Sequence, residues 1–474
     1  MRAVDRNLLV HDASTATTGL HAGRRPRASV FGEVPALVGL AVPVVAGLAG
    51  STVLGVIDSY MLGPLGEVPL AAASLTQSCL VIFYAGLYGL VGAVGVFVGQ
   101  AHGAGYPWRV GRIFRHGLVI GLGAGFVAAL AMAALLLVLP YTGQPAEVLA
   151  MLPSYWIAMS ALLVPFTLTM VIKLFLDSIG RPWTGAVLTL LPIALNIPLN
   201  WLMIYGNYGF PKLGLLGAGI ASLLALIGGF ILMILYLGCA PSMAPYRDAI
   251  KLRAADFSEL TREGYPMSIQ YLAEGSAVAI AGVLIGLLGA TALAANQIVF
   301  SVGVLIYMAP LGIAGAVSIR IAQAYGEGAT RRIRAIGLAG LLVVTLWMLA
   351  FTTIMVLWGE PISRVFVTDK PVIAAATAMF VAVGVMQVFD GLQSVGLGAL
   401  RGMLDNRWPT VVSLVSYWLI ALPLSALFGF KLGYGGAGIW AGFGMGLAVA
   451  GILLVWRFLS QTKKLAGNDQ FGSN

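Results

Sequence analysis

The chain has 474 residues, of which 59% are hydrophobic and only 9% are Asp, Glu, Lys or Arg. Soluble domains carry about 25% charged residues, so this composition, with a mean hydropathy of +0.94, excludes a water-exposed surface over most of the protein. A net charge of +9 would suit nucleic acid only on the basic face of a soluble module, so we expect no nucleic-acid partner and interpret the excess as cytoplasmic loops of a membrane protein.

The first 33 residues are polar, carry five arginines and lack the apolar core of a secretory signal. We predict a disordered cytoplasmic tail over 1–33. About twelve mostly apolar stretches follow, each long enough to cross a bilayer as a helix of about 20 residues. Their expected limits are 35–62, 69–101, 112–139, 149–177, 183–206, 214–238, 259–286, 292–325, 335–358, 371–400, 408–430 and 435–458. The predicted fold class is an all-α polytopic membrane protein in contact with membrane lipid.

Basic residues set the expected orientation. With both termini in the cytoplasm, the proposed outer loops hold only Lys212, Arg364, Lys370 and Lys431. The inverted topology would place nearly every basic residue outside, against the positive-inside rule. We therefore predict a multi-pass protein of the cell inner (plasma) membrane with both termini cytoplasmic, and we interpret the inner basic clusters as topology anchors.

The chain repeats itself at a displacement of 223 residues. Gly92-Ala93-Val94 falls on Gly315-Ala316-Val317, and Gln100-Ala101 falls on Gln323-Ala324. Two halves of about six spans each predict two pseudo-symmetric six-helix bundles, with a substrate cavity at their interface and alternating access by rocking. The expected parts after the tail are a first bundle over 34–238, a cytoplasmic linker over 239–257, a second bundle over 258–458 and a cytoplasmic tail over 459–474.

Three carboxylates lie inside predicted spans: Asp58 in the first, Glu274 in the seventh and Asp390 in the tenth. A charge at such depth costs at least about 2.5–3.5 kcal/mol, so each is a functional candidate. Helical rise places Glu274 near the midplane and Asp390 well inside, so the two are expected to share a site in the second bundle. Asp58 is expected to belong to the first bundle. A buried carboxylate can take up a proton or bind a hard cation such as Na⁺, so these three residues are the predicted coupling-cation ligands.

Several polar or aromatic residues are predicted to support these acids. Gln387 precedes Asp390 by one helical turn, and Gln270 and Tyr271 precede Glu274 by one turn. Tyr271 or Tyr307 would add cation–π attraction to a cationic substrate. In the fifth span, Pro198 lies between two amides one turn apart, Asn196 and Asn200, which are expected either to complete a cation site with Asp58 or to hold the bundle together.

The alternative for every buried acid is a structural ion pair with a buried base. Lys173 and Arg320 are the candidate bases well inside the spans, and both lie toward cytoplasmic ends. For Asp177 a structural pair with Lys173, one turn away, is favoured. No cofactor or metal other than Na⁺ is expected, because Cys79 and Cys239 lack metal-ligand spacing and the histidines fall outside the spans or at their margins. The sequence offers no catalytic motif, so no enzyme is predicted.

The chain resembles the MATE (multidrug and toxic compound extrusion) family, and it is most similar to its NorM-like bacterial branch. The matching motifs, in order, are Val56-Ile57-Asp58-Ser59-Tyr60-Met61-Leu62-Gly63, Asn196-Ile197-Pro198-Leu199-Asn200-Trp201, Gly264-Tyr265-Pro266 followed by Glu274, Ala294-Ala295-Asn296-Gln297, Asp390, and Leu400-Arg401-Gly402 followed by Asp405-Asn406-Arg407-Trp408-Pro409. One departure is Asn296, where the family often has His.

The resemblance implies a cation-coupled antiporter that exports organic, often cationic, compounds or drugs while Na⁺ or H⁺ enters. It implies that Glu274 and Asp390 bind the coupling cation, and that Asp58 with Asn196 and Asn200 forms a polar site in the first bundle. The protein is expected to work as a monomer. The alternative is a flippase of lipid-linked saccharides from the same wider fold group, but its anionic substrates would favour a basic cavity, and the buried inventory here is acidic.

Overall fold

The computed structural model describes residues 29–247 and 252–471, and over these residues it contains helices and no strand. Twelve helical segments within these described ranges are long and apolar enough to cross a membrane. The all-α polytopic fold class is confirmed. The longer helices are α2 (Val30–Leu62), α3 (Glu67–Gly103), α4 (Pro107–Leu135), α5 (Ala146–Ala161), α6 (Leu163–Ser178), α7 (Pro182–Tyr205), α8 (Leu215–Cys239), α9 (Ala254–Gly286), α10 (Ala290–Gly326), α11 (Thr330–Phe366), α12 (Lys370–Gly402) and α15 (Gly435–Phe471).

Helix ends differ from the expected segment limits at three places. α2 begins at Val30, inside the predicted tail, because the Ser29 hydroxyl caps it by accepting from the Gly32 N–H at 3.0 Å. The linker is shorter than expected, since a 3₁₀ helix covers Pro241–Tyr246 and α9 begins at Ala254. α15 continues to Phe471, through most of the predicted C-terminal tail. The tail predicted before residue 29 lies outside the described residues.

Prolines interrupt two of the spans. The fourth is two helices, α5 and α6, that meet at Leu162, where Pro165 has no N–H to donate to the carbonyl one turn earlier. The eleventh begins as α13 (Arg407–Leu414) and widens into a π-helical segment, η5 (Val415–Ala421), ahead of Pro423 in α14 (Leu422–Ala426). A second π segment, η6 (Leu427–Lys431), completes this span. π turns shift side chains out of the ordinary helical register and occur often at functional sites.

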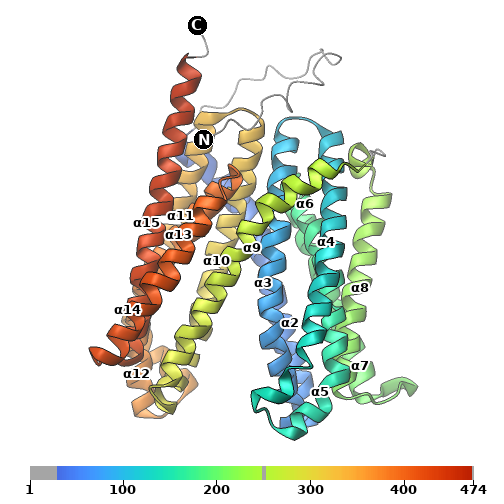
Figure 1. Cartoon of the computed structure of the whole chain (residues 1–474), viewed down its shortest axis with the longest axis vertical. Coiled ribbons are helices and arrows are strands. Elements are labelled where there is room, and N and C mark those ends of the chain that lie inside the picture. The colour runs from blue at the N-terminus through green and yellow to red at the C-terminus, as the bar shows by residue number, and fades with distance from the viewer. Residues whose placement is uncertain (1–28, 248–251, 472–474) are drawn as a thin grey trace.

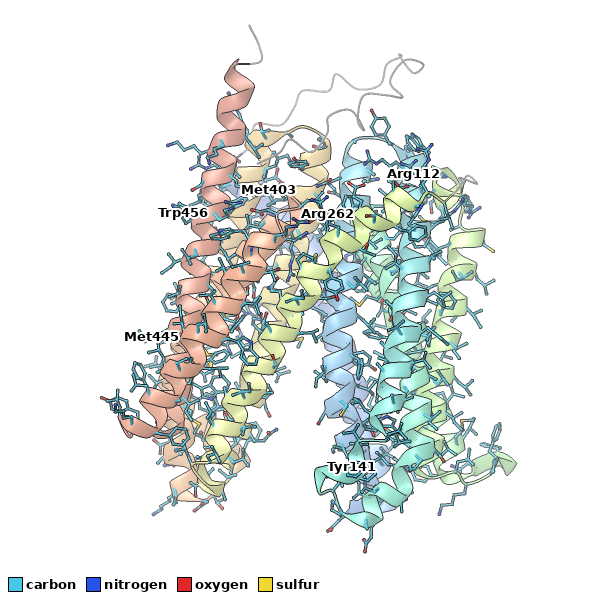
Figure 2. The ribbon with its side chains drawn as sticks, viewed as in Figure 1. Arg112, Tyr141, Arg262, Met403, Met445 and Trp456 are labelled. Carbon is cyan, nitrogen blue, oxygen red and sulfur yellow. The ribbon has the colours of Figure 1, made fainter. Side chains whose placement is uncertain are left out.

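The helices form two groups, which we call the N-lobe (α2–α8) and the C-lobe (α9–α15). In Figure 1 the lobes lie together at the upper end, where α9 crosses toward α4, and they diverge toward the lower end. Figure 2 places Arg112 and Arg262 near the upper end and Tyr141 at the opposite end.

The first helix of each lobe packs on the second helix of the other lobe. Where α9 crosses α3, a Cβ on Gly89 would lie 2.5 Å from the backbone of Ser268, and the Ser268 hydroxyl donates to the Gly86 carbonyl at 2.6 Å. Where α2 crosses α10, a Cβ on Gly312 would lie 2.3 Å from Val45. These two crossings are related by the internal repeat, so the lobes exchange equivalent contacts in both directions.

The second helices of the two lobes, α3 and α10, meet near the upper end of Figure 1. The Gln323 amide donates to the Ser178 carbonyl at 2.9 Å, and its repeat partner Gln100 donates to the Gly402 carbonyl at 3.3 Å. A Cβ on Gly103 would lie 2.1 Å from the Gln323 carbonyl oxygen. This close approach requires glycine, and it ties the end of each lobe to the other.

We predict that Gly103→Ala weakens the contact between the lobes. The added methyl overlaps a backbone oxygen that no side-chain movement can displace, so α3 and α10 must separate at a cost of about 1–3 kcal/mol. Thermal unfolding of the purified protein in detergent measures the loss as a lower midpoint. The matched control is Gly123→Ala in α4, where a Cβ meets nothing within 4 Å. An unchanged midpoint for Gly103→Ala would contradict the described crossing.

Candidate functional site

A cavity of about 210 Å³ lies inside the C-lobe, among α9, α10, α12, η5 and α15. It contains both predicted acids of this lobe, Glu274 from α9 and Asp390 from α12, together with Gln387 and Tyr307. Its other lining residues are Val278, Val299, Phe300, Gly303, Val304, Val383, Met386, Tyr417, Trp440, Phe443 and Leu447. The structure therefore brings together Glu274, Asp390, Gln387 and Tyr307.

Two phenols lie beside the acids of the cavity. Tyr307 and Tyr417 line it together with Glu274 and Asp390. The Tyr307 hydroxyl also contacts the Ser394 hydroxyl at 2.8 Å. Within residues 29–247 and 252–471, neither acid lies in an ion pair with a basic side chain. The residues that line the cavity beside the two carboxylates are all neutral.

The cavity contains oxygen acceptors with no donor. Asp390 Oδ1 and Gln387 Oε1 are buried without a hydrogen-bond partner. The Gln387 amide nitrogen is already committed, because it donates to the Gly303 carbonyl at 3.1 Å, so its oxygen is directed elsewhere. Unmet buried acceptors cost free energy unless a ligand satisfies them. Carboxylate and amide oxygens are the ligands that hard cations prefer, and a proton on one carboxyl would satisfy the same need.

Aromatic side chains form much of the cavity wall. Trp440 packs edge-on against Phe443 with ring centroids 5.7 Å apart, and its indole N–H donates to the Asn296 side-chain oxygen at 2.8 Å. The ring centroids of Tyr417 and Phe443 lie 5.9 Å apart. Apolar and aromatic walls around a few acids suit a lipophilic organic cation. Sequence reasoning missed Tyr417, Trp440 and Phe443. One usable signal was the position of Trp440, directly after the repeated Gly-Ala-Gly-Ile motif.

Gln270 and Tyr271 lie outside this cavity, contrary to expectation. Their side chains turn to Arg401 of α12, which donates to the Tyr271 hydroxyl at 2.7 Å and to the Gln270 oxygen at 2.9 Å. The Arg401 guanidinium also lies 4.6 Å from the centre of the Tyr271 ring. The aromatic face proposed for a cationic substrate is therefore occupied by a cation of the protein itself.

The predicted site of the N-lobe forms a row of polar side chains. The Asn200 amide lies 2.6 Å from an Asp58 oxygen and 2.7 Å from the Asn196 oxygen, and the Asn196 amide donates to the Ser222 hydroxyl at 2.9 Å. Asn196 and Asn200 are fully buried. Ser222 ends this row through its contact with Asn196, and sequence reasoning missed it. Asp58 does not line the C-lobe cavity.

The candidate bases are bound elsewhere. Lys173 lies 2.6 Å from Asp177, the pair that we expected to be structural. Arg320 pairs with Glu33 of α2, which also accepts from Arg332 at 2.8 Å. Neither base is therefore available to Asp58, Glu274 or Asp390.

One histidine differs from expectation. His116 was placed at the margin of a span, but it is fully buried in α4. Its Nε2 accepts from the Arg253 N–H at 2.9 Å at the start of α9, and its Nδ1 contacts the Arg112 carbonyl at 2.8 Å. This contact could not be predicted from local sequence patterns, because His116 and Arg253 lie 137 residues apart.

Comparisons with known proteins extend over most of the chain. The family model described as MatE matches residues 43–202 and 266–427. A "Probable multidrug resistance protein NorM" from Rhizobium meliloti is 33% identical over 85% of this chain and 88% of its own length. A protein of the same description from a Synechococcus species is 31% identical over 84% of this chain and 88% of its own length. The structure of the Vibrio cholerae MATE transporter VcmN in the bent form is 18% identical and shares the fold with a TM-score of 0.82, over 92% of this chain and 98% of that chain.

Proposed function

Because the chain belongs to the MatE family of multidrug efflux transporters, we propose that it exports organic, often cationic, compounds in exchange for Na⁺ or H⁺. The transporter is taken to work by alternating access and to need no cofactor beyond the coupling ion. The curated relatives are named for multidrug resistance, which supports small-molecule cargo.

The observation that carries this proposal is the pair of acids in the C-lobe cavity. Glu274 and Asp390 share one cavity with two phenols and have no ion-pair partner within the described part of the chain. The cavity also contains acceptors without donors. Two carboxylates in a low-dielectric site are stabilised by protons, by a metal cation or by an organic cation. Binding of one cation lowers the affinity for another, and this competition is the chemical basis of exchange.

The arrangement of the lobes supports alternating access. The lobes are tied together at one end by Gln100, Gln323 and Gly103, and they diverge toward the other end. Two repeat-related lobes that pack through equivalent helices can rock against each other. The space between them then closes at one end and opens at the other. The Asp58 site of the N-lobe would supply a second cation or substrate position, since its row of amides and hydroxyls offers oxygens next to a carboxylate.

We further propose that the transporter is a monomer in the cell inner membrane, in contact with lipid, with both termini in the cytoplasm. The basic residues Arg331 and Arg334 at the start of α11 would then lie inside, and Lys431 at the end of η6 would lie outside. The cavity is built from a single chain, so the monomer suffices for it.

The orientation predicts opposite labelling of two cysteine variants. In intact cells, a membrane-impermeant maleimide is expected to label Lys431→Cys, and to label Arg331→Cys only after the membrane is opened. Cys79 and Cys239 are free thiols, so both are first replaced by Ser and that background serves as the blank. The reversed labelling pattern would overturn the orientation.

Glu274→Gln is expected to abolish coupled efflux, because an amide neither takes up a proton nor balances a cation. Proteoliposomes preloaded with ethidium, and driven separately by a sodium gradient and by a pH gradient, measure the rate and identify the coupling ion. Asp390→Asn is expected to reduce the same rate by about tenfold or more, the effect of about 1.4 kcal/mol.

Glu360→Gln is the control, because Glu360 is exposed and pairs with Arg364 at a helix end. It should transport like the unaltered protein. If the unaltered protein shows no efflux under either gradient, or if Glu274→Gln retains full rate at equal reconstitution, the proposed function fails.

Asp58→Asn tests the N-lobe site separately. The change keeps the side-chain shape and its contact with Asn200 but removes the charge, so we expect a weaker apparent affinity for the driving ion or for ethidium. The proteoliposome assay at varied ion and ethidium concentrations distinguishes the two. Unaltered kinetics under both gradients would remove Asp58 from the transport mechanism.

A further inference from the structure

Arg401 lies in the last turn of α12, but its side chain is directed at a neighbouring helix. It donates to Gln270 and Tyr271, both on α9, and its guanidinium lies over the Tyr271 ring. Gln270 is only 1% exposed. An arginine near a membrane surface ordinarily extends its charged head toward water. Here it makes its contacts inside the helix bundle instead.

The guanidinium of Arg401 has no carboxylate within ion-pair distance in the described part of the chain. Lys173 and Arg320, the candidate bases of the sequence analysis, each pair with an acid. Arg401 has only a phenol oxygen and an amide oxygen. A buried charge held by neutral groups is costly and is retained where it serves a function.

The residues that hold Arg401 lie next to the cavity acid. Gln270 and Tyr271 precede Glu274 on α9 by four and three residues, which places all three on one face, about 4.5–6 Å apart along the axis. Arg401 is thus held by side chains of the α9 turn that precedes Glu274. If the Arg401 side chain turned along α9, its charge would move from Gln270 toward Glu274.

Donors without acceptors lie around Arg401, and acceptors without donors lie in the adjacent cavity. Around Arg401, the donors Arg401 Nε and Gln270 Nε2 lack acceptors. In the adjacent cavity, the acceptors Asp390 Oδ1 and Gln387 Oε1 lack donors. The ionisable groups that surround both positions are Glu274, Asp390, Tyr88, Tyr271, Tyr307 and Tyr417. The acids among them are all in the cavity.

We propose that Arg401 is a tethered cation that moves to Glu274 when the cavity is empty and returns to Gln270 and Tyr271 when a cation binds. This inference rests on the proposed function, since it supplies the counter-charge for the part of the cycle in which neither coupling ion nor substrate is present. An incoming cation must displace Arg401 from Glu274, so Arg401 lowers the apparent affinity of the cavity for cations. The negative charge of Glu274 is then compensated while the cavity is empty. The transporter can therefore change the side of the membrane to which the empty cavity opens.

The first test is Arg401→Gln in the full-length protein, purified into lipid nanodiscs with ethidium far below its dissociation constant, so that the displacing ion concentration reports the affinity for the ion alone. The readout is the concentration of Na⁺, or of H⁺, that displaces half of the ethidium. Loss of the internal competitor is expected to strengthen ion binding, so that this concentration falls at least about fivefold. Arg401→Lys keeps the charge and should stay close to the unaltered protein. In a Glu274→Gln background, Arg401→Gln should leave ethidium affinity unaltered.

The second test changes the ion dependence in the opposite direction. Tyr271→Phe removes the hydroxyl that accepts from Arg401 while it keeps the ring, so Arg401 is released toward Glu274. The ion concentration that displaces half of the ethidium should therefore rise. A purely structural role for Arg401 would not produce shifts of opposite sign in these two variants. Arg320→Gln is the control, because Arg320 pairs with Glu33 and not with a cavity residue. This variant should leave the displacing ion concentration unchanged.

The outcomes separate the inference from the function beneath it. If the unaltered protein binds its coupling ion in a Glu274-dependent way but Arg401→Gln has unchanged ion dependence, the tethered-cation inference fails and the transport function stands. If no ion displaces ethidium from the unaltered protein, the proposed function fails. Should Arg401→Gln not fold, Tyr271→Phe decides alone, and an unchanged or lower displacing concentration overturns the inference.

Discussion

The structure depends on keeping carboxylates inside a membrane protein without permanent basic partners. Glu274 and Asp390 share a cavity where phenols and amides are their neighbours, while the bases Lys173 and Arg320 are bound to other acids. A permanent ion pair would satisfy these carboxylates and leave them no role in exchange. Within the described residues neither acid has an ion-pair partner, so under the proposed function their charge is available to a mobile cation. The aromatic wall and the unmet acceptors of the cavity would then give that cation a defined place.

The repeat explains how such a cavity can sit in a stable bundle. Membrane helices gain little from the hydrophobic effect on one another, so close packing and hydrogen bonds must hold the lobes together. Gly89 and Gly312, at repeat-related crossings, let α9 and α2 approach the opposite lobe closely. Gln100 and Gln323 add repeat-related hydrogen bonds at one end. The scaffold is symmetric, whereas the acids are not: Ser51 occupies the position that matches Glu274. The residues that hold the lobes together are therefore different from the acids that line the cavity.

Sequence reasoning located the spans, the repeat and the acids, because insertion cost and hydropathy are local properties of the chain. It could not place side chains that depend on helix register across the bundle. Tyr417 reaches the cavity from a π-helical segment, whose widened register the apolar pattern does not reveal. Tyr271 was correctly seen to precede Glu274 by a turn, but its partner Arg401 lay one residue beyond the predicted span and was treated as cytoplasmic. Helical side chains lean toward the helix N-terminus, and in α12 that direction leads back into the bundle.

Helix α9 connects the C-lobe cavity to the contact between the lobes. Ser268 binds the backbone of α3, Tyr271 packs edge-on against Tyr88 of α3 at 5.3 Å, and Glu274 reaches the cavity. These residues span six positions, about 9 Å of one helix. Any rearrangement that separates α9 from α3 removes the Tyr88 contact from the ring on which Arg401 lies. A ligand shifts an equilibrium only through contacts that differ between two states. Glu274 with Arg401, and Tyr271 with Tyr88, are contacts of this kind on one rigid element, so occupancy of the cavity and the position of the lobes bias the same helix.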